Sequence, residues 1–195
     1  MHVIFLLAML WVEPFWETKA PKEWNDEDLL EMFHNSPWAQ STQFQNTIPI
    51  AVYLATAKPM RDAEEEAIRR YTSKQPGSQP PDMGARNEYL AYLEENPGKS
   101  IVLAIREPDV TALAEAEETR RMEKESQLKA GGKKYRMTGY FPPAGADPVL
   151  RLVFPRPPAQ VKELAFDIYI PGITGPYRQA SFRLKDLNYR GRPEY

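Results

Sequence analysis

The most restrictive feature of the sequence is its proline content. Nineteen prolines occur in 195 residues, about twice the usual share, and most of them lie between segments with regular apolar spacing. Because proline lacks a backbone N–H donor and has a fixed φ, it interrupts helices and central strands. The sequence therefore predicts a loop-rich α+β domain rather than a helical bundle. Apolar residues make up 42% and charged residues 27% of the chain, which is typical of a globular protein.

The C-terminal third has the pattern of an antiparallel sheet. Four strand-like runs are separated there by segments with proline or glycine, at residues 134–141, 149–154, 163–170 and 177–184. Alternation is clearest in the third run, where Leu164, Phe166 and Ile168 share one face and Asp167 lies on the other. We expect a mainly antiparallel sheet with a C-terminal β-meander and one face toward the core. The segment 171–176, "PGITGP", is expected to be a hairpin loop.

Further elements are expected upstream of these runs. Apolar runs predict buried strands over residues 48–57 and 100–107. Three to four short surface helices complete the predicted fold, at residues 25–36, 60–71, 87–96 and 109–131. The first has explicit boundaries, because Asn25 is a good N-cap and Pro37 removes a helical donor. The last is rich in charge and poor in large apolar side chains, so we expect it to be mostly exposed.

The N-terminus contains an apolar run, Val3–Val12. It is too short to span a bilayer as a helix, which needs about 20 residues, and its length fits the apolar part of a secretory signal. We therefore expect residues 1–20 to be a signal peptide or hydrophobic leader and residues 21–195 to form one domain. The expected location is outside the cytoplasm, in the periplasm or extracellular space. The alternative is a cytoplasmic protein in which this run is a buried strand or helix.

Composition excludes several chemistries. The chain has no cysteine, so disulfides, thiolate metal sites and cysteine nucleophiles are absent, and its two histidines are far apart in sequence. We expect no metal site and no cofactor, and we interpret His34 as a cation at a helix C-terminus. The formal net charge of -2 gives no field that would attract a polyanion, so we expect no nucleic-acid partner. Contact with a membrane would come only through an uncleaved leader.

Three residues are candidates for a site. Trp38 follows a helix that ends at Ser-Pro, so it is either an anchor into the core or an exposed contact for a partner, and we favour the anchor. Arg156 lies between prolines in "LVFPRPP", where a structural role is favoured over a ligand clamp. Asp167 is the one acid within a confident strand, and we interpret it as a strand-surface carboxylate rather than a catalytic group.

Four stretches, in order, resemble a family of uncharacterised exported proteins abundant in Acidobacteria: "WNDEDLLEMFHNSPWAQ", "TAKPMRDAEEEAIRR", "LVFPRPP" and "SFRLKDLNYRGRPEY". The features that carry the resemblance are a helix ending in Ser-Pro-Trp-Ala, a Phe-Pro-Arg strand end and a C-terminal Phe-x-Leu-Lys-Asp-x-x-Tyr stretch. The Arg-Trp-Glu-Ser-Ala stretch of that family appears here as Tyr53–Ala57, without its Arg and Glu, and its C-terminal Met is Leu187. The resemblance implies export and a single shared domain. It assigns no activity and no functional residue.

Two functional hypotheses follow. The first is a non-catalytic interaction module of the cell envelope or periplasm with an envelope protein as its partner. The second is a hydrolase or transferase that uses carboxylates and Arg156 in a cleft at the strand ends. A convergence of Asp167 or another acid with Arg156 would favour the second.

Overall fold

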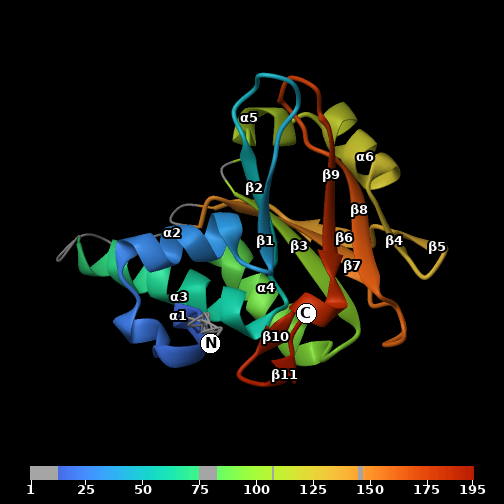
Figure 1. The fold of residues 1–195 in the computed structure, drawn as a ribbon. Helices are drawn as coiled ribbons and strands as arrows, with labels where there is room; N and C mark the ends of the chain where they lie inside the picture. Colours follow the sequence, from blue (N-terminus) through green and yellow to red (C-terminus); the bar gives the residue numbers. More distant parts are fainter. Residues whose placement is uncertain (1–12, 75–82, 107, 145–146) are drawn as a thin grey trace, which may run out of the picture.

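A five-stranded sheet forms the middle layer of the molecule, with the helices α1 to α4 on one face and a four-stranded sheet on the other, and α6 packs beside the second sheet (Figure 1). The computed structural model describes residues 13–74, 83–106, 108–144 and 147–195. The helices are α1 (Phe15–Thr18), α2 (Asp26–Asn35), α3 (Lys58–Ser73), α4 (Gly84–Glu95), α5 (Val110–Leu113) and α6 (Ala116–Glu125), with 3-10 turns η1 (Pro21–Glu23) and η2 (Leu184–Asp186). The strands are β1 (Ala39–Thr42), β2 (Ile50–Leu54), β3 (Ser100–Arg106), β4 (Gln127–Ala130), β5 (Lys133–Arg136), β6 (Gly139–Phe141), β7 (Val149–Pro155), β8 (Glu163–Tyr169), β9 (Tyr177–Arg183), β10 (Asn188–Tyr189) and β11 (Arg192–Pro193).

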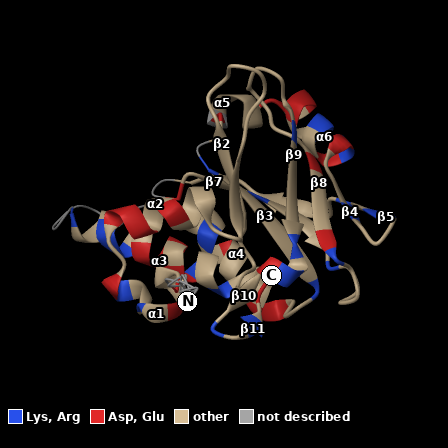
Figure 2. Ribbon diagram, in the orientation of Figure 1, with Lys and Arg blue, Asp and Glu red and all other residues tan. Residues whose placement is uncertain are grey.

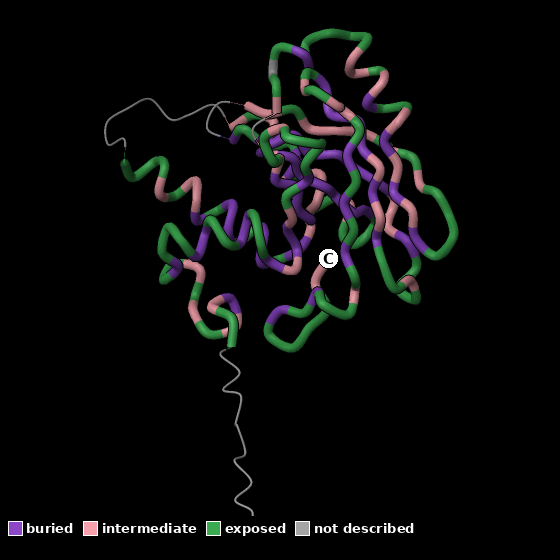
Figure 3. The backbone as a smooth tube through the Cα atoms, turned by 45° about the horizontal axis from the view of Figure 1, so that its top comes forward, coloured by how far each residue is buried: buried purple, intermediate pink, exposed green. Residues whose placement is uncertain are grey.

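The first sheet has the strand order β1-β2-β3-β7-β6, and all its pairings are antiparallel. The first six residues of both β3 and β7 are buried, because helices cover one face and the second sheet covers the other. Figure 3 shows that buried residues gather in these central strands. The continuous apolar runs that predicted buried strands at 48–57 and 100–107 therefore correspond to β2 and β3.

The second sheet has the order β5-β4-β8-β9 and is covered by the first sheet on its inner face. Burial alternates along β8 and β9, as the sequence pattern predicts. Phe166 of β8 packs edge-on against Phe154 of β7, with ring centroids 5.4 Å apart, and against Phe182 of β9 at 6.0 Å. These aromatic contacts join the two sheets into one core.

The prediction for α2 is confirmed at both ends. The Asn25 side chain accepts a hydrogen bond from the Asp28 backbone N–H at 2.7 Å, and the Asp28 carboxylate accepts one from the Asn25 N–H at 2.9 Å. This reciprocal capping satisfies donors that an uncapped helix start would leave free. The helix ends before Ser36, which is extended as expected for a residue that precedes proline. His34 is an exposed residue in its last turn.

The prediction of one long helix over 109–131 is wrong. Asp109 does cap a helix, since it accepts hydrogen bonds from the Thr111 and Ala112 N–H groups, but that helix, α5, ends at Leu113. The chain then forms α6 and, from Gln127, the strand β4. Pairing with β5 and β8 provides β4 with its backbone partners, and this tertiary pairing overrides the helical propensity of the segment.

The α+β class with mainly antiparallel sheets is confirmed, and the described residues form six α-helices where we expected three or four. The C-terminal strands are divided between the sheets. Strands β6 and β7 pair in the first sheet, whereas β8 and β9 pair in the second. The expected hairpin loop at 171–176 joins β8 to β9.

Residues 15–19, which we assigned to the leader, contact the domain. The ring of Trp16 lies 6.1 Å from that of Trp38, and Glu17 accepts a hydrogen bond from the Arg190 backbone N–H at 2.8 Å. The apolar run Val3–Val12 lies outside the described residues. Among the described residues, no helix is long and apolar enough to cross a membrane.

Candidate functional site

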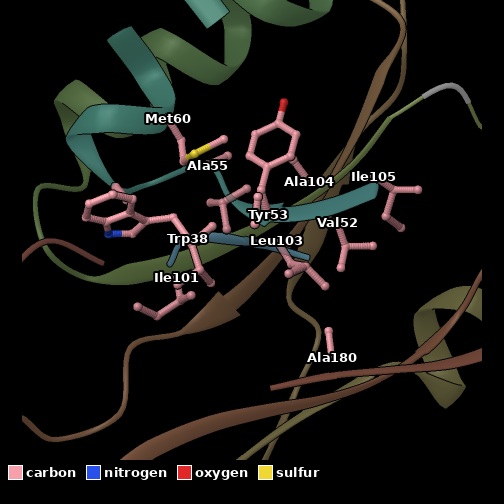
Figure 4. Close-up of a cluster of buried hydrophobic side chains, with 14 of the residues drawn as sticks. Trp38, Val52, Tyr53, Ala55, Met60, Ile101, Leu103, Ala104, Ile105 and Ala180 are labelled. Atoms are coloured by element: carbon pink, nitrogen blue, oxygen red, sulfur yellow. The ribbon is translucent and has the colours of Figure 1, made fainter. Parts of the chain in front are cut away.

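Trp38 is an anchor of the core rather than a surface contact. It is fully buried, and its indole Nε1 donates a hydrogen bond to the Glu194 backbone carbonyl at 2.7 Å. The rings of Trp16 and Tyr189 pack edge-on against it, each with its centroid 6.1 Å away. Figure 4 places Trp38 in the buried cluster with Met60 and Ile101. Trp38 thus joins the segment after α2 to the C-terminal residues and is not available to a ligand.

Arg156 also contacts the C-terminal segment. Its Nη2 donates a hydrogen bond to the Tyr195 carbonyl oxygen at 2.6 Å, and its guanidinium lies over the Tyr195 ring at 5.0 Å. Its backbone N–H donates to the Lys99 carbonyl oxygen at 2.9 Å. These contacts give Arg156 a structural role in holding the chain beyond β11. Within the described residues, no residue contacts both the Arg156 side chain and the Asp167 carboxylate.

Asp167 lies at the centre of a row of polar side chains on the outer face of the second sheet. The sheet register aligns Gln127 of β4, Asp167 of β8 and Gln179 of β9. Gln127 Nε2 donates to Asp167 Oδ2 at 2.9 Å, and Gln179 Nε2 donates to Oδ1 at 3.0 Å. Lys129 forms an ion pair with the same carboxylate. Burial alone would raise the pKa of Asp167, but these three donors outweigh it and lower the pKa.

The next row of this face contains Lys129, Ala165 and Ser181, which are aligned by the same register, and the last two have small side chains. The Gln40 side chain of β1 binds the Ser181 backbone at the edge of β9, donating to its carbonyl oxygen at 2.6 Å and accepting from its N–H at 3.2 Å. Gln40 therefore occupies a strand-edge position beside β9, and the short side chain of Ala165 leaves a depression between the rows.

These two rows form the floor of a groove, which we call the sheet groove. It consists of three connected depressions with volumes of about 690, 270 and 470 Å³. The first two share Asp167 and Gln179, and the second and third share Lys129 and Ala165. The groove therefore runs across the outer face of the sheet, from the end of β1 to the β4–β5 turn. Figure 2 shows that charged residues gather on α2, α3 and α6, whereas the strands carry few.

The end of the sheet groove near β1 has an aromatic side chain and unsatisfied polar atoms. Tyr177 is 58% exposed, and its hydroxyl donates a hydrogen bond to Glu125 at the end of α6. Thr42 and Arg178 line the same depression and are buried. Thr42 Oγ1 and Arg178 Nε have no hydrogen-bond partner among the described residues. Buried polar atoms are normally paired, so these two are exceptions, but neither atom presents surface to the groove.

A second pocket, of about 240 Å³, lies over a buried ion cluster between α3 and the first sheet and is lined in part by Glu64, Asp147 and Arg106. Glu64 Oε2 accepts from Arg86 Nη1 at 2.7 Å, and its Oε1 accepts from the Tyr53 hydroxyl at 2.6 Å. Burial alone would raise the pKa of Glu64, but the charges of Arg151 and Arg86 outweigh it and lower the pKa. Both carboxylates at this pocket already have guanidinium partners, so we assign the cluster to structure.

Sequence reasoning identified Asp167 but not the rest of the groove. The sequence pattern places Gln127 and Lys129 in a helix, and it does not identify Gln40, Ala165 or Gln179 as site residues. The position of Gln179 could have been predicted, because residues 177–184 are expected to form a strand, in which Gln179 faces the opposite side from Arg178 and Ala180. The fold brings Asp167 together with Gln127 and Gln179, but not with Arg156.

The fold and the site define a two-sheet α+β protein with an extended polar groove on the outer face of its second sheet. Comparisons with protein families, with curated proteins and with solved structures found no significant match for this chain. Within the described residues, no group of three or more His, Cys, Asp or Glu side chains is arranged to hold a metal ion.

Proposed function

We propose that the protein is a non-catalytic interaction module of the cell envelope or periplasm and that the sheet groove is its binding surface. The observation that carries the proposal is the row Gln127–Asp167–Gln179, which is fixed across three adjacent strands on the outer face of the second sheet. Helix α6 covers this face only at its Tyr169 end. Side chains on paired strands are held more rigidly than those on loops, which lowers the entropic cost of binding.

The chemistry of the groove favours binding over catalysis. A general acid or base works best with a pKa near the operating pH. The pKa of Asp167 is instead lowered, because the donors Lys129, Gln127 and Gln179 outweigh the opposing effect of burial. The carboxylate therefore stays ionised and occupied by its own neighbours. Its role in the proposal is to orient two amide side chains.

The proposed location rests on the sequence. The apolar run Val3–Val12 and the resemblance to exported bacterial proteins support export. Expression from the full native gene, followed by fractionation and intact-mass measurement, tests it. A mature chain without this run, outside the cytoplasm, is expected. An uncleaved chain in the cytoplasm would contradict the proposed location.

Filling the groove tests the proposed surface. Ala165→Arg places a long side chain in the middle depression, whereas Ala91→Arg makes the same change on an exposed position of α4, away from the second sheet. Each purified variant is incubated with the sedimented envelope fraction of the producing cells, and the bound protein is measured. We expect Ala165→Arg to reduce binding at least tenfold and Ala91→Arg to leave it unchanged. Equal binding by both variants would contradict the proposed surface.

A further inference from the structure

We infer that the sheet groove binds a neutral, hydroxyl-rich polymer, that is, a polysaccharide chain. This inference rests on the proposed function, since it names the class of ligand for the same groove. It depends on four features of the described residues: the amides on the groove floor, the balance of charge, the course of the groove and the tyrosine at one end.

The amides on the floor match the chemistry of a hydroxyl group. Gln127 and Gln179 each use one N–H to bind Asp167. Each amide retains a second N–H donor and a carbonyl acceptor. A sugar hydroxyl both donates and accepts hydrogen bonds, so one amide can satisfy both of its functions. Asp167 fixes the two amides on either side of one carboxylate, which presents them as an ordered pair.

The balance of charge favours a neutral ligand. The residues that line the three depressions include three acids, Glu125, Asp167 and Glu163, and three cations, Lys129, Lys162 and Arg178. Lys129, at the centre, is already paired with Asp167. A nucleic acid or another polyanion needs an excess of cations to replace its counterions. The groove offers no such excess.

The course of the groove favours a chain held by side chains over a peptide added as a strand to β9. Strand addition needs free backbone groups at a sheet edge. At the β9 edge, Gln40 occupies both the N–H and the carbonyl of Ser181. The groove crosses the face of the sheet, where side chains rather than backbone groups are exposed. Its three depressions adjoin one another, since neighbouring depressions share lining residues. An extended polymer can therefore occupy several depressions together.

Tyr177 supplies an aromatic surface at one end of the groove. Its ring is held by the hydrogen bond from its hydroxyl to Glu125 and by edge-on packing with Tyr169 at 5.3 Å. A tyrosine ring is apolar on its faces and polar at its hydroxyl, so it suits a sugar, whose C–H groups form an apolar face while its hydroxyls remain polar.

The class of ligand is tested on the envelope fraction itself. One portion is treated with periodate, which cleaves the vicinal diols of sugars, and another is digested with protease. The binding of the full-length protein to each portion is compared with its binding to untreated material. We expect binding to survive the protease and to fall at least tenfold after periodate. Binding that survives periodate and is lost after the protease would overturn the inference.

Two variants test whether the binding to envelope material takes place in the sheet groove. Tyr177→Ala and Gln179→Ala both change exposed side chains, so their melting temperatures should stay close to that of the wild type. Each should weaken binding about tenfold, as expected for the loss of one stacking or hydrogen-bonding contact. Tyr71→Ala, which removes an exposed tyrosine from α3, is the matched control and should bind as the wild type does.

The outcomes separate the inference from the proposed function. If Ala165→Arg abolishes binding but the bound material is sensitive only to protease, the groove is a binding surface and the inferred ligand class is wrong. If Ala165→Arg binds as well as the wild type, or if the wild type does not bind the envelope fraction, the proposed function fails and the inference fails with it.

Discussion

Arg151 and Glu64 form an ion pair inside the protein. Arg151 Nη2 lies 2.9 Å from Glu64 Oε1, and the exposed fractions of the two side chains are 0% and 2%. Arg151 is a β7 residue and Glu64 belongs to α3, so the pair joins the first sheet to the helical layer. Ala104 lies between Tyr53 and Arg151 in the sheet register. Its small side chain leaves room for the Glu64 carboxylate to contact both the Tyr53 hydroxyl and the Arg151 guanidinium.

Removal of Glu64 should be strongly destabilising. In Glu64→Ala, the guanidinium groups of Arg86 and Arg151 lose a buried anionic partner, and breaking such a pair typically costs about 3–5 kcal/mol. Urea unfolding at pH 7 measures the loss. Glu65→Ala, on the exposed side of the same helix, is the control and should change stability by less than about 0.5 kcal/mol. A similar small effect for Glu64→Ala would show that the cluster contributes little.

Trp38 should contribute to stability rather than to binding. Trp38→Ala removes a fully buried indole and should lower the free energy of unfolding by about 3–5 kcal/mol. Trp38→Phe keeps most of the apolar contact but leaves the Glu194 carbonyl without its donor, so a loss of about 1–3 kcal/mol is expected. Chemical unfolding gives both values. Folded Trp38→Phe should bind the envelope fraction as the wild type does, and reduced binding would contradict its role as an anchor.

Glu66 should give stability a distinct acid dependence. Hydrogen bonds from Arg69, and then from Arg70, outweigh the effect of burial and lower the pKa of Glu66 from 4.5 to about 2. Because the folded-state pKa is depressed, the carboxylate stabilises the fold above its ordinary pKa, and this contribution is lost as the pH falls toward 2.

Glu66→Gln provides the test of this acid dependence. Its unfolding free energy should be lower than that of the wild type by about 1–2 kcal/mol at pH 7. The difference should narrow when urea titrations are repeated between pH 4.5 and 2. A difference that stays constant down to pH 2 would argue against the assignment.

Gly172 should tolerate no side chain. Its φ is +78°, and an added Cβ would lie 2.6 Å from Ala112 Cβ and 2.7 Å from Asp109 Cβ. Gly132 has a similar φ of +76° with nothing within 4 Å, so Gly132→Ala measures the backbone strain alone. Thermal and chemical unfolding should show Gly172→Ala to be less stable than Gly132→Ala by about 1–3 kcal/mol, the usual cost of overpacking. Equal losses would mean that α5 moves away without cost.

The sequence determined the elements whose signals are local. Asn25 and Pro37 define α2 because a cap and a missing donor act within one turn of the chain. The apolar run around Leu103 predicted a strand buried on both faces, since neither face could be left in water. The alternation around Phe166 correctly placed Asp167 on the outer face of β8.

Which strands are neighbours, and therefore which side chains form the site, depends on long-range packing. Gln127 looks helical in a charged segment and becomes a strand residue because β8 supplies its partners 40 residues away. Nothing local to the strand predicted at 149–154 indicates the partner of Arg151, because α3 brings Glu64 to it and α4 brings Arg86 to the same carboxylate. Local periodicity records which face a side chain occupies, but the alignment of Gln127, Asp167 and Gln179 depends on long-range pairing. The candidate groove therefore could not be predicted from the sequence and is evident only from the pairing of the strands.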